Sequence, residues 1–283
     1  MQGRSGMNDE ISFFSKIRLL FVGECIHGVS EFTLFKQEIA ESYFFENSIL
    51  VFEADCAGMQ LSNVEHDPTY LRLTNFPKVM RTKETLQLLS WAIDRQIPCL
   101  GIDCIPRRDL ADFSRVLQPL RRRKIAQNNM MKGTDSYFVW RDSQMANNLL
   151  KILNDYPESR ILVMLHNLHI KKMGSMENSD LSLLSVREII EKALPGQSCS
   201  IAQFARGGQA LHNDLTEFNF HIDDPLAIET YPFTSQSKSV LTFQIPKDRV
   251  GWHHAFEQEK IPVCEQYEGC NVFTSVHPPS LID

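Results

Sequence analysis

Short apolar runs that alternate with amphipathic stretches limit most strongly what this chain can fold into. Runs such as Ile17–Gly23 and Ile49–Glu53 have the length of buried strands, and between them Ser30–Glu46 carries apolar residues at helical spacing. A strand–helix–strand alternation of this kind builds a parallel sheet covered by helices on both faces. The sequence therefore predicts an α/β fold with a central, mainly parallel sheet and helices on both faces.

The same periodicity sets the order of the remaining elements. Further strands are expected at Pro98–Ile102, Arg160–Leu165, Ser200–Phe204 and Asn271–Val276, and further helices at Lys83–Arg95, Pro106–Asn128, Ser136–Asn154 and Leu184–Ala193. The stretch 207–265 is less regular, and no repeat, low-complexity tract or linker divides the chain. We expect a single α/β domain over residues 1–283, with residues 1–10 as a flexible tail or an expression scar.

The composition excludes several classes of protein. A hydrophobic share of 43% excludes a disordered chain, and a formal net charge of −6 argues against nucleic acid as the main partner. Every apolar run is shorter than the ~18 residues of a membrane span, and the N-terminus lacks the pattern of a secretory signal. Seven cysteines without a CxxC pair favour reduced thiols, and hence a cytoplasmic protein or one delivered to a cytosol.

Ionisable residues follow four of the predicted strands, at the point where each strand ends. In chain order these residues are Glu24, His27, Glu53, Asp55, Asp103, His166 and His169. One such residue is usually a loop hydrogen-bonder or a helix cap, but four strand ends together favour a site. Because the carboxyl ends of parallel strands meet at one edge of a sheet, we expect these side chains around one crevice.

Two kinds of chemistry fit these side chains. A neutral imidazole with a pKa near ~6.5 takes a proton from water when a carboxylate fixes its tautomer. Glu24 or Glu53 supplies that carboxylate to His27, which predicts a general base. Alternatively, Glu24 and the three metal candidates His27, Glu53 and His166 are ligands for Zn²⁺ or Fe²⁺. Spacing does not separate the two, and a buried His27 bonded to a loop carbonyl is the structural alternative.

The segment GECIHGVSEFTLFK (Gly23–Lys36) resembles the signature of the erythromycin esterase family. Six further blocks continue the resemblance in the same order: FEAD (Phe52–Asp55), ETLQLLSWAIDRQIPCLGIDC (Glu84–Cys104), WRDSQMANNLLKIL (Trp140–Leu153), LHNLHIKKMG (Leu165–Gly174), IAQFARGGQ (Ile201–Gln209) and NVFTSVHPPSLI (Asn271–Ile282). The blocks span nearly the whole chain, and their common order makes the resemblance fairly specific.

The resemblance implies a hydrolase that cleaves an ester or related acyl bond with water activated by His27, oriented by Glu24 and Glu53. His166 then contacts the substrate or the developing oxyanion. The other residues expected around the substrate are Lys36, Asp55, Asp103, Arg141 and His169, with Arg141 anchoring Asp55 or Asp103. The resemblance implies no required cofactor, with a divalent metal or haem as the alternative.

The resemblance also sets two alternatives in function. Only 37 residues separate Asp103 from Arg141, fewer than in family members that inactivate macrolides, so we expect a smaller cleft and another substrate. The wider superfamily includes bacterial virulence effectors and toxin domains, whose target is a host molecule, and haem- or metal-binding modules. An effector of this kind is secreted into a host cell without a cleaved signal peptide.

Three weaker signals have structural interpretations. Acidic neighbours of Cys25 and Cys56 raise a thiol pKa and disfavour a nucleophilic cysteine. The basic run 121–124 is predicted to be a solvated helix face, not a nucleic-acid patch. His253 and His254, as adjacent residues, cannot share one helix face, and we expect them in a surface turn.

Overall fold

A seven-stranded sheet forms the centre of the protein. The computed structural model describes residues 17–43, 47–177, 182–232, 239–241, 244–253 and 259–282. Six neighbouring strands are parallel, and the seventh, at one edge, is antiparallel. Their order across the sheet is β3 (Cys99–Asp103), β2 (Ser48–Asp55), β4 (Arg160–Met164), β1 (Leu19–Val22), β5 (Ser198–Ala205), β11 (Gly269–Phe273) and β8 (Ser239–Leu241).

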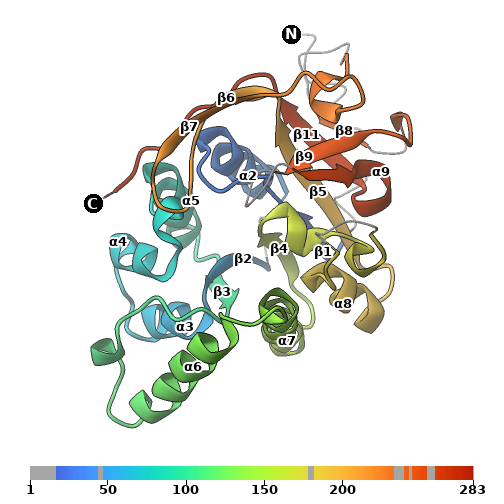
Figure 1. Cartoon of the computed structure of the whole chain (residues 1–283). Helices are drawn as coiled ribbons and strands as arrows, with labels where there is room; N and C mark the ends of the chain where they lie inside the picture. The colour runs from blue at the N-terminus through green and yellow to red at the C-terminus, as the bar shows by residue number, and fades with distance from the viewer. Residues whose placement is uncertain are drawn as a thin grey trace.

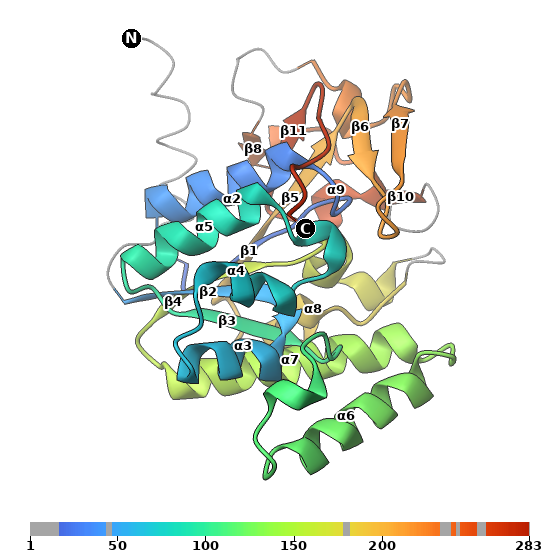
Figure 2. The same ribbon diagram turned by 90° about the vertical axis from the view of Figure 1, so that its left-hand side faces the viewer.

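Helices cover both faces of this sheet because successive residues of a strand point to opposite faces. Leu20 and Val22 pack with α2 (Ser30–Tyr43) and α5 (Lys83–Asp94). Leu19 and Phe21 pack with α7 (Tyr137–Asp155) and α8 (Val186–Ala193) on the other face. Figures 1 and 2 show α2 and α5 on one side of the strands and α7 on the other. The predicted fold class is confirmed.

The remaining elements are short or lie at the periphery. The helices among them are α3 (Cys56–Val64), α4 (Thr69–Arg72), α6 (Gln118–Met131), α9 (Val263–Gln266) and the 3₁₀ turns η1 (Leu73–Asn75), η2 (Lys78–Met80), η3 (Leu110–Asp112), η4 (Asn167–Ile170), η5 (Gly174–Met176) and η6 (Ile228–Thr230). The strands are the antiparallel pairs β6 (Gly207–Leu211) with β7 (Glu217–His221), and β9 (Val250–His253) with β10 (Glu259–Pro262).

One expected helix is wrong over its first half. The stretch Pro106–Asn128 was predicted to be helical, but the helix α6 begins at Gln118. The side-chain oxygen Oδ2 of Asp55 accepts hydrogen bonds from the backbone N–H groups of Arg107 and Arg108, at 2.9 and 3.2 Å. These bonds hold the chain after β3 as a loop, because the backbone donors point to Asp55 instead of a preceding helical turn.

The hairpin of β6 and β7 reaches the carboxyl end of the central sheet. It arches over α2 in Figure 1, and a β-bridge joins Gly28, in the turn after β1, to Leu211 at the end of β6. A Cβ atom on Gly28 would lie 2.2 Å from the carbonyl oxygen of Leu211, so this close approach requires glycine. The turn that carries His27 is therefore fixed against the hairpin.

Two further predictions concern the N-terminal residues and membrane-spanning helices. Residues 1–10, expected as a flexible tail or scar, lie outside the described residues. Within the described ranges, every helix is too short or too polar to cross a membrane.

Candidate active site

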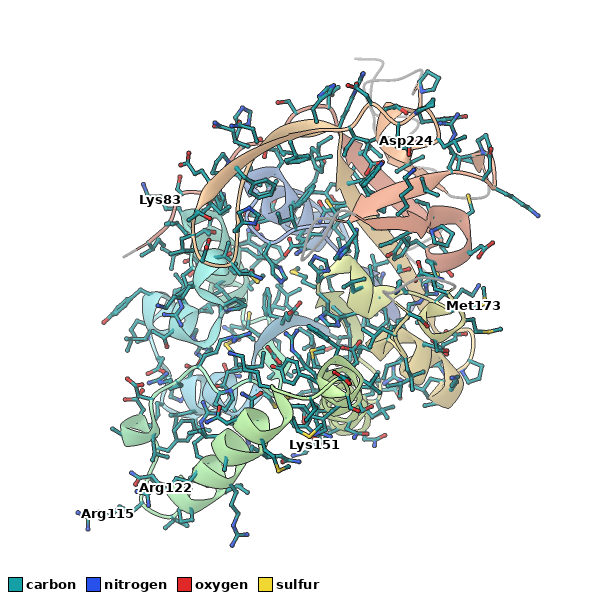
Figure 3. The ribbon with its side chains drawn as sticks, viewed as in Figure 1. Lys83, Arg115, Arg122, Lys151, Met173 and Asp224 are labelled. Atoms are coloured by element: carbon teal, nitrogen blue, oxygen red, sulfur yellow. The ribbon has the colours of Figure 1, made fainter. Side chains whose placement is uncertain are left out.

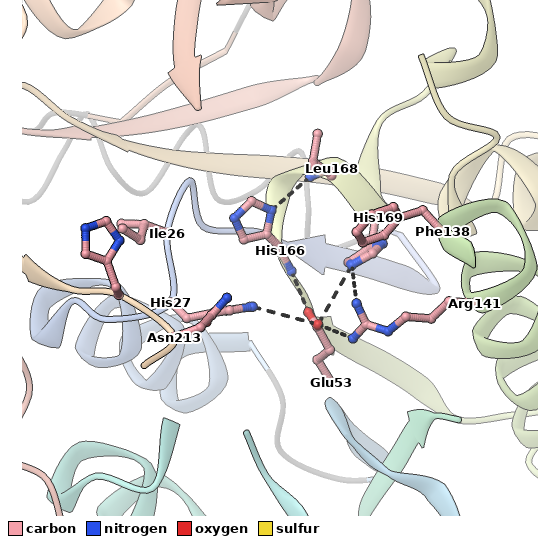
Figure 4. Close-up of a pocket in the computed structure, with 10 residues that line it drawn as sticks. Ile26, His27, Glu53, Phe138, Arg141, His166, Leu168, His169 and Asn213 are labelled. Atoms are coloured by element: carbon pink, nitrogen blue, oxygen red, sulfur yellow. Dashed lines mark hydrogen bonds and ion pairs between the residues drawn. The ribbon is translucent and has the colours of Figure 1, made fainter. Parts of the chain in front are cut away.

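The strand order brings the predicted site residues together. Because β2, β4 and β1 are neighbours, Glu53 at the end of β2 lies beside His166 after β4 and His27 after β1. They line a pocket of about 80 Å³. Figure 4 shows this pocket, which is lined by Ile26, His27, Glu53, Phe138, Arg141, His166, Leu168, His169, His212 and Asn213.

Five of the nine predicted site residues line this pocket and four do not. The five are His27, Glu53, Arg141, His166 and His169. The other four are buried behind it or beside it: Glu24, Lys36, Asp55 and Asp103. Of these, Asp55 and Asp103 line a separate small cavity beside α6 and α7.

A buried chain of charges orients His27. The ammonium Nζ of Lys36 donates to Oε2 of Glu24 at 2.6 Å, and Nδ1 of His27 lies 2.7 Å from Oε1 of the same carboxylate. Because an ionised carboxylate can only accept a hydrogen bond, Nδ1 must carry the proton and donate a hydrogen bond to Glu24. The other ring nitrogen, Nε2, therefore has the lone pair, and it lies 3.8 Å from Oε1 of Glu53.

Glu53 is held as a carboxylate by Arg141. Nη2 of Arg141 donates to Oε1 of Glu53 at 2.5 Å, and the backbone N–H of His166 donates to Oε2 at 3.1 Å. Burial alone would raise the pKa of Glu53, but the charge of Arg141, with further contributions from the neighbouring histidines when they are protonated, outweighs burial and holds the pKa well below its ordinary value. Glu53 therefore keeps its negative charge in the pocket.

Arg141 is itself fixed by Asp103. Its Nε donates to Oδ1 of Asp103 at 3.0 Å and its Nη2 to Oδ2 at 2.9 Å, which is the bidentate geometry that orients a guanidinium. Asp103 was one of two carboxylates expected beside Arg141. The other, Asp55, instead binds Arg121 of α6.

His169 has a carboxylate partner that sequence analysis missed. Its Nδ1 lies 2.7 Å from Oδ1 of Asp142, and its Nε2 lies 3.8 Å from Oε1 of Glu53. Burial alone would lower the pKa of His169, but Asp142 and Glu53 outweigh burial and raise it. Asp142 directly follows Arg141 in the chain, and this adjacency was the available signal.

His253 contacts the site from a distant part of the chain. It was expected in a surface turn, but it lies in β9 with 0% of its surface exposed, which corrects that prediction. Its Nε2 lies 3.2 Å from Nδ1 of His166, and the two rings meet edge to face. His254 lies outside the described residues. Burial, followed by the neighbouring His253 and His27, holds the pKa of His166 well below its ordinary value.

The basic run 121–124 was predicted to be a solvated helix face, but one of its residues is buried. Arg121 is buried, binds the carboxylate of Asp55 and lies over the ring of Phe113. Arg122 projects outward from α6, as Figure 3 shows. The helix periodicity turns one member of the run inward, so the interpretation as a solvated face holds only for the others.

Neither cysteine beside the site is poised for nucleophilic chemistry. Burial raises the pKa of Cys25 well above its ordinary value, with further contributions from Glu229 and Glu24. Burial also raises the pKa of Cys56. Both thiols therefore stay protonated near neutral pH.

The metal alternative gains no support from the geometry. Among the residues that the structure describes, no three His, Cys, Asp or Glu side chains are grouped so that they could hold a metal ion. Of the candidates His27, Glu53 and His166, Glu53 already binds the cationic Arg141 through Oε1. A metal at this place stays an untested prediction.

Comparisons with known proteins define the fold. No protein-family model and no curated protein matches the sequence. Solved structures do match: a protein from Bacillus cereus has a TM-score of 0.71 at 14% identity, over 99% of this chain and 93% of that chain. A mutant of the erythromycin esterase EreC in its open conformation has a TM-score of 0.70 at 13% identity, over 98% of this chain and 96% of that chain.

A succinoglycan biosynthesis protein has a TM-score of 0.72 at 11% identity, over 98% of this chain and 92% of that chain. At these identities the likeness concerns the fold. The chain has the α/β fold of erythromycin esterase, as the resemblance of its sequence blocks implied.

Proposed function

We propose that this protein is a hydrolase that cleaves an ester or related acyl bond with water activated by His27. The orientation of His27 carries the proposal: Lys36 and Glu24 fix its proton on Nδ1 and leave Nε2 as a base on the pocket. The shared fold with erythromycin esterase supports the same reaction class.

The pocket residues supply each part of such a reaction. Nε2 of His27 takes a proton from water while the water oxygen bonds to the acyl carbon. The resulting imidazolium lies between two carboxylates, Glu24 at 2.7 Å and Glu53 at 3.8 Å, which stabilise its charge. When the intermediate collapses, the carbon–oxygen bond to the alcohol breaks, and the alcohol oxygen takes the proton from His27.

The size of the pocket bears on the substrate. Its volume of about 80 Å³ is well below the ~300–1,000 Å³ of pockets that enclose drug-sized ligands. Phe138 at the start of α7 and His212 and Asn213 in the turn between β6 and β7 form part of its wall. We therefore propose a substrate with a small acyl group at the reacting carbon, not a macrolide.

Hydrolysis of p-nitrophenyl acetate, p-nitrophenyl butyrate and erythromycin by purified protein tests the proposal. We expect turnover of the small esters, and a loss of kcat of about 10²- to 10⁴-fold in His27→Gln. His221→Gln is the matched control, since His221 is 59% exposed on β7, and it should hydrolyse at the wild-type rate. Full activity of His27→Gln would rule out His27 as the base.

We also propose that the reaction needs no metal. The positive charge of Arg141, bound to Glu53 and Asp103, already occupies the place where a cation would neutralise these carboxylates. Activity should survive dialysis against EDTA and should not rise when Zn²⁺ is added back. Loss of activity in EDTA with recovery on addition of Zn²⁺ would contradict this. No contact among the described residues favours the effector or haem-binding alternative, and both stay predictions.

A further inference from the structure

His166 brings a buried polar atom without a hydrogen-bond partner to the pocket. The side chain of His166 is 3% exposed, and its Nε2 makes no hydrogen bond within the described structure. An unpaired buried polar atom costs free energy, so its presence calls for an explanation such as a bound ligand. Since His166 lines the pocket, this nitrogen is available to a bound ligand. Whether it donates or accepts depends on the tautomer of the ring.

The other nitrogen of His166 decides the tautomer. The backbone N–H of Leu168 donates to Nδ1 of His166 at 3.4 Å, so that His166 caps the short helix η4. A backbone N–H is always a donor, so Nδ1 must accept. Nδ1 of His166 also lies 3.2 Å from Nε2 of His253. Since Nδ1 accepts, Nε2 of His253 must carry the proton and act as the donor of this bond. The proton of neutral His166 is left on Nε2.

The strand β9 holds His253 rigidly in this position. The backbone N–H of Trp252 donates to Oε1 of Glu229 at 2.7 Å, and that of Val250 donates to the carbonyl of Leu226 at 3.2 Å. Gly251 lies so close to Phe204 of β5 that a Cβ atom would be 2.3 Å from its ring. His253 is therefore delivered by a strand that is fixed to η6 and to the central sheet, not by a free loop.

The charged groups around His166 agree with a neutral ring. Its ring centroid lies 5.0 Å from that of His27 and 6.4 Å from that of His169, and Glu53 binds its backbone N–H. Protonated forms of His253, His27 and His169 disfavour a further positive charge on His166, whereas the carboxylate of Glu53 favours it. Burial is the largest cause and also disfavours the charge, so the pKa of His166 is lowered.

We propose that His253 is a positioning residue that keeps His166 in the tautomer with its proton on Nε2, so that this N–H donates to the carbonyl oxygen of the bound ester. The tautomer follows from the contacts alone, while its use toward an ester rests on the proposed function. As the carbonyl oxygen gains negative charge during the attack of water, a preorganised donor stabilises it. The base, His27, and the donor, His166, would thus be opposite tautomers, each fixed by a partner behind it.

The tautomer is measured directly by long-range ¹H–¹⁵N correlation spectra of protein labelled with ¹⁵N-histidine. His166→Gln identifies the signals of His166. We expect the wild-type ring to carry its proton on Nε2. His253→Phe keeps a ring but removes the closer of the two donors to Nδ1 and leaves only the longer bond from Leu168, at 3.4 Å, so the variant should shift His166 toward the Nδ1 tautomer. His253→Gln, which offers an N–H of similar reach, should restore the wild-type tautomer.

Kinetics add a second measurement. His253→Phe should lower kcat roughly 3- to 10-fold with little change in KM, as expected for one hydrogen bond used in the transition state. His253→Gln should recover most of kcat. A wild-type His166 protonated on Nδ1, or a His253→Phe variant with an unchanged tautomer, would overturn the proposal. If His253→Phe fails to fold, the wild-type spectrum and the His253→Gln variant decide. Absence of esterase activity with the expected tautomer would contradict the proposed function alone.

Discussion

At the scale of single residues, the two carboxylates that flank His27 differ in what fixes them. Glu24 is paired with Lys36 behind the pocket, while Glu53 is paired with Arg141 on the pocket wall. The first can orient the base and the second can meet its developing charge. This division follows from the elements that supply the cations: Lys36 lies on α2 and Arg141 on α7, on opposite faces of the sheet.

The pair of Lys36 and Glu24 makes a prediction about stability. Lys36→Met leaves Glu24 buried with one cation fewer, and we expect the free energy of unfolding to fall by about 3 to 5 kcal/mol. The double variant Lys36→Met, Glu24→Gln should recover part of this loss, because it removes the charge as well. Urea unfolding measures both. Lys192→Met is the control, since Lys192 is 65% exposed and its surface pair contributes under about 1 kcal/mol. Equal losses in Lys36→Met and Lys192→Met would contradict a buried pair.

The pair of His169 and Asp142 makes a prediction about pH. Asp142 helps to raise the pKa of His169, so the positive form persists to higher pH than in a free histidine. If this charge assists the reaction, kcat falls as pH rises through that pKa. Asp142→Asn lowers the pKa of His169 and should move this fall to lower pH, which a profile of kcat against pH will show. An unmoved profile would mean that the charge of His169 is not used.

There is a physical reason why sequence patterns predicted some of these site residues and missed others. His27, Glu53 and His166 each follow a strand, and the convergence of parallel strand ends brings them together wherever the loops run. His253 lies in an irregular stretch, and its place beside His166 depends on how β9 packs against η6. That packing is tertiary and leaves no local periodicity. Asp142 was visible only as the neighbour of Arg141.

At the scale of elements, the buried side chain of Arg121 is a main attachment of α6 to the sheet. The helix contributes little apolar surface, and Arg121 joins it to Asp55 at the end of β2. Arg121→Ala should lower the free energy of unfolding by about 3 to 5 kcal/mol, because Asp55 would lose its buried partner. Arg122→Ala, one position along the same helix and exposed, should change it by less than about 0.5 kcal/mol.

Urea unfolding of the two arginine variants separates these expectations. Equal effects in both would mean that the basic run acts as a solvated face throughout. The contrast also shows why the run could not be interpreted from charge alone. Four consecutive basic residues point around most of a helix, and only the packing of α6 decides which one turns inward.

The same distinction separates the elements that the sequence predicted from those that it missed: the first have a local pattern and the second do not. Buried parallel strands such as Arg160–Met164 are continuous apolar runs, so their place in the sequence was visible. The helix Cys56–Val64 follows β2 directly, without the loop that usually separates the two, and was missed. The loop from 104 to 117 depends on Asp55, 52 residues before Arg107, and no local pattern carries that information.

At the scale of the whole molecule, the segment of η6 and β9 that brings His253 to the site contains a buried acid, Glu229. Glu229 in η6 is 4% exposed, its Oε1 accepts from Trp252, and its Oε2 has no partner within the described structure. Burial raises the pKa of Glu229 from 4.5 to about 8. The folded protein therefore holds a proton there at neutral pH, which the unfolded chain releases.

This difference sets the sign of a pH effect on folding. Between about pH 4.5 and pH 8 the folded state binds one proton more at Glu229 than the unfolded state does. The free energy of unfolding must then fall as pH rises through this window, by up to about 1.4 kcal/mol for each pH unit. Below the window both states are protonated, and above it both are ionised, so the contribution is constant on either side.

Glu229→Gln isolates the effect, because glutamine is neutral at every pH and nearly the same shape. Other groups titrate in the same range, and Glu53, with its lowered pKa, acts in the opposite direction as pH falls. These contributions are common to both proteins and cancel in the difference. We expect the free energy of unfolding of wild type minus that of Glu229→Gln, from urea curves at pH 5 to 9, to decrease up to about pH 8 and then level. Parallel curves for the two proteins would mean that Glu229 is already ionised in the folded state.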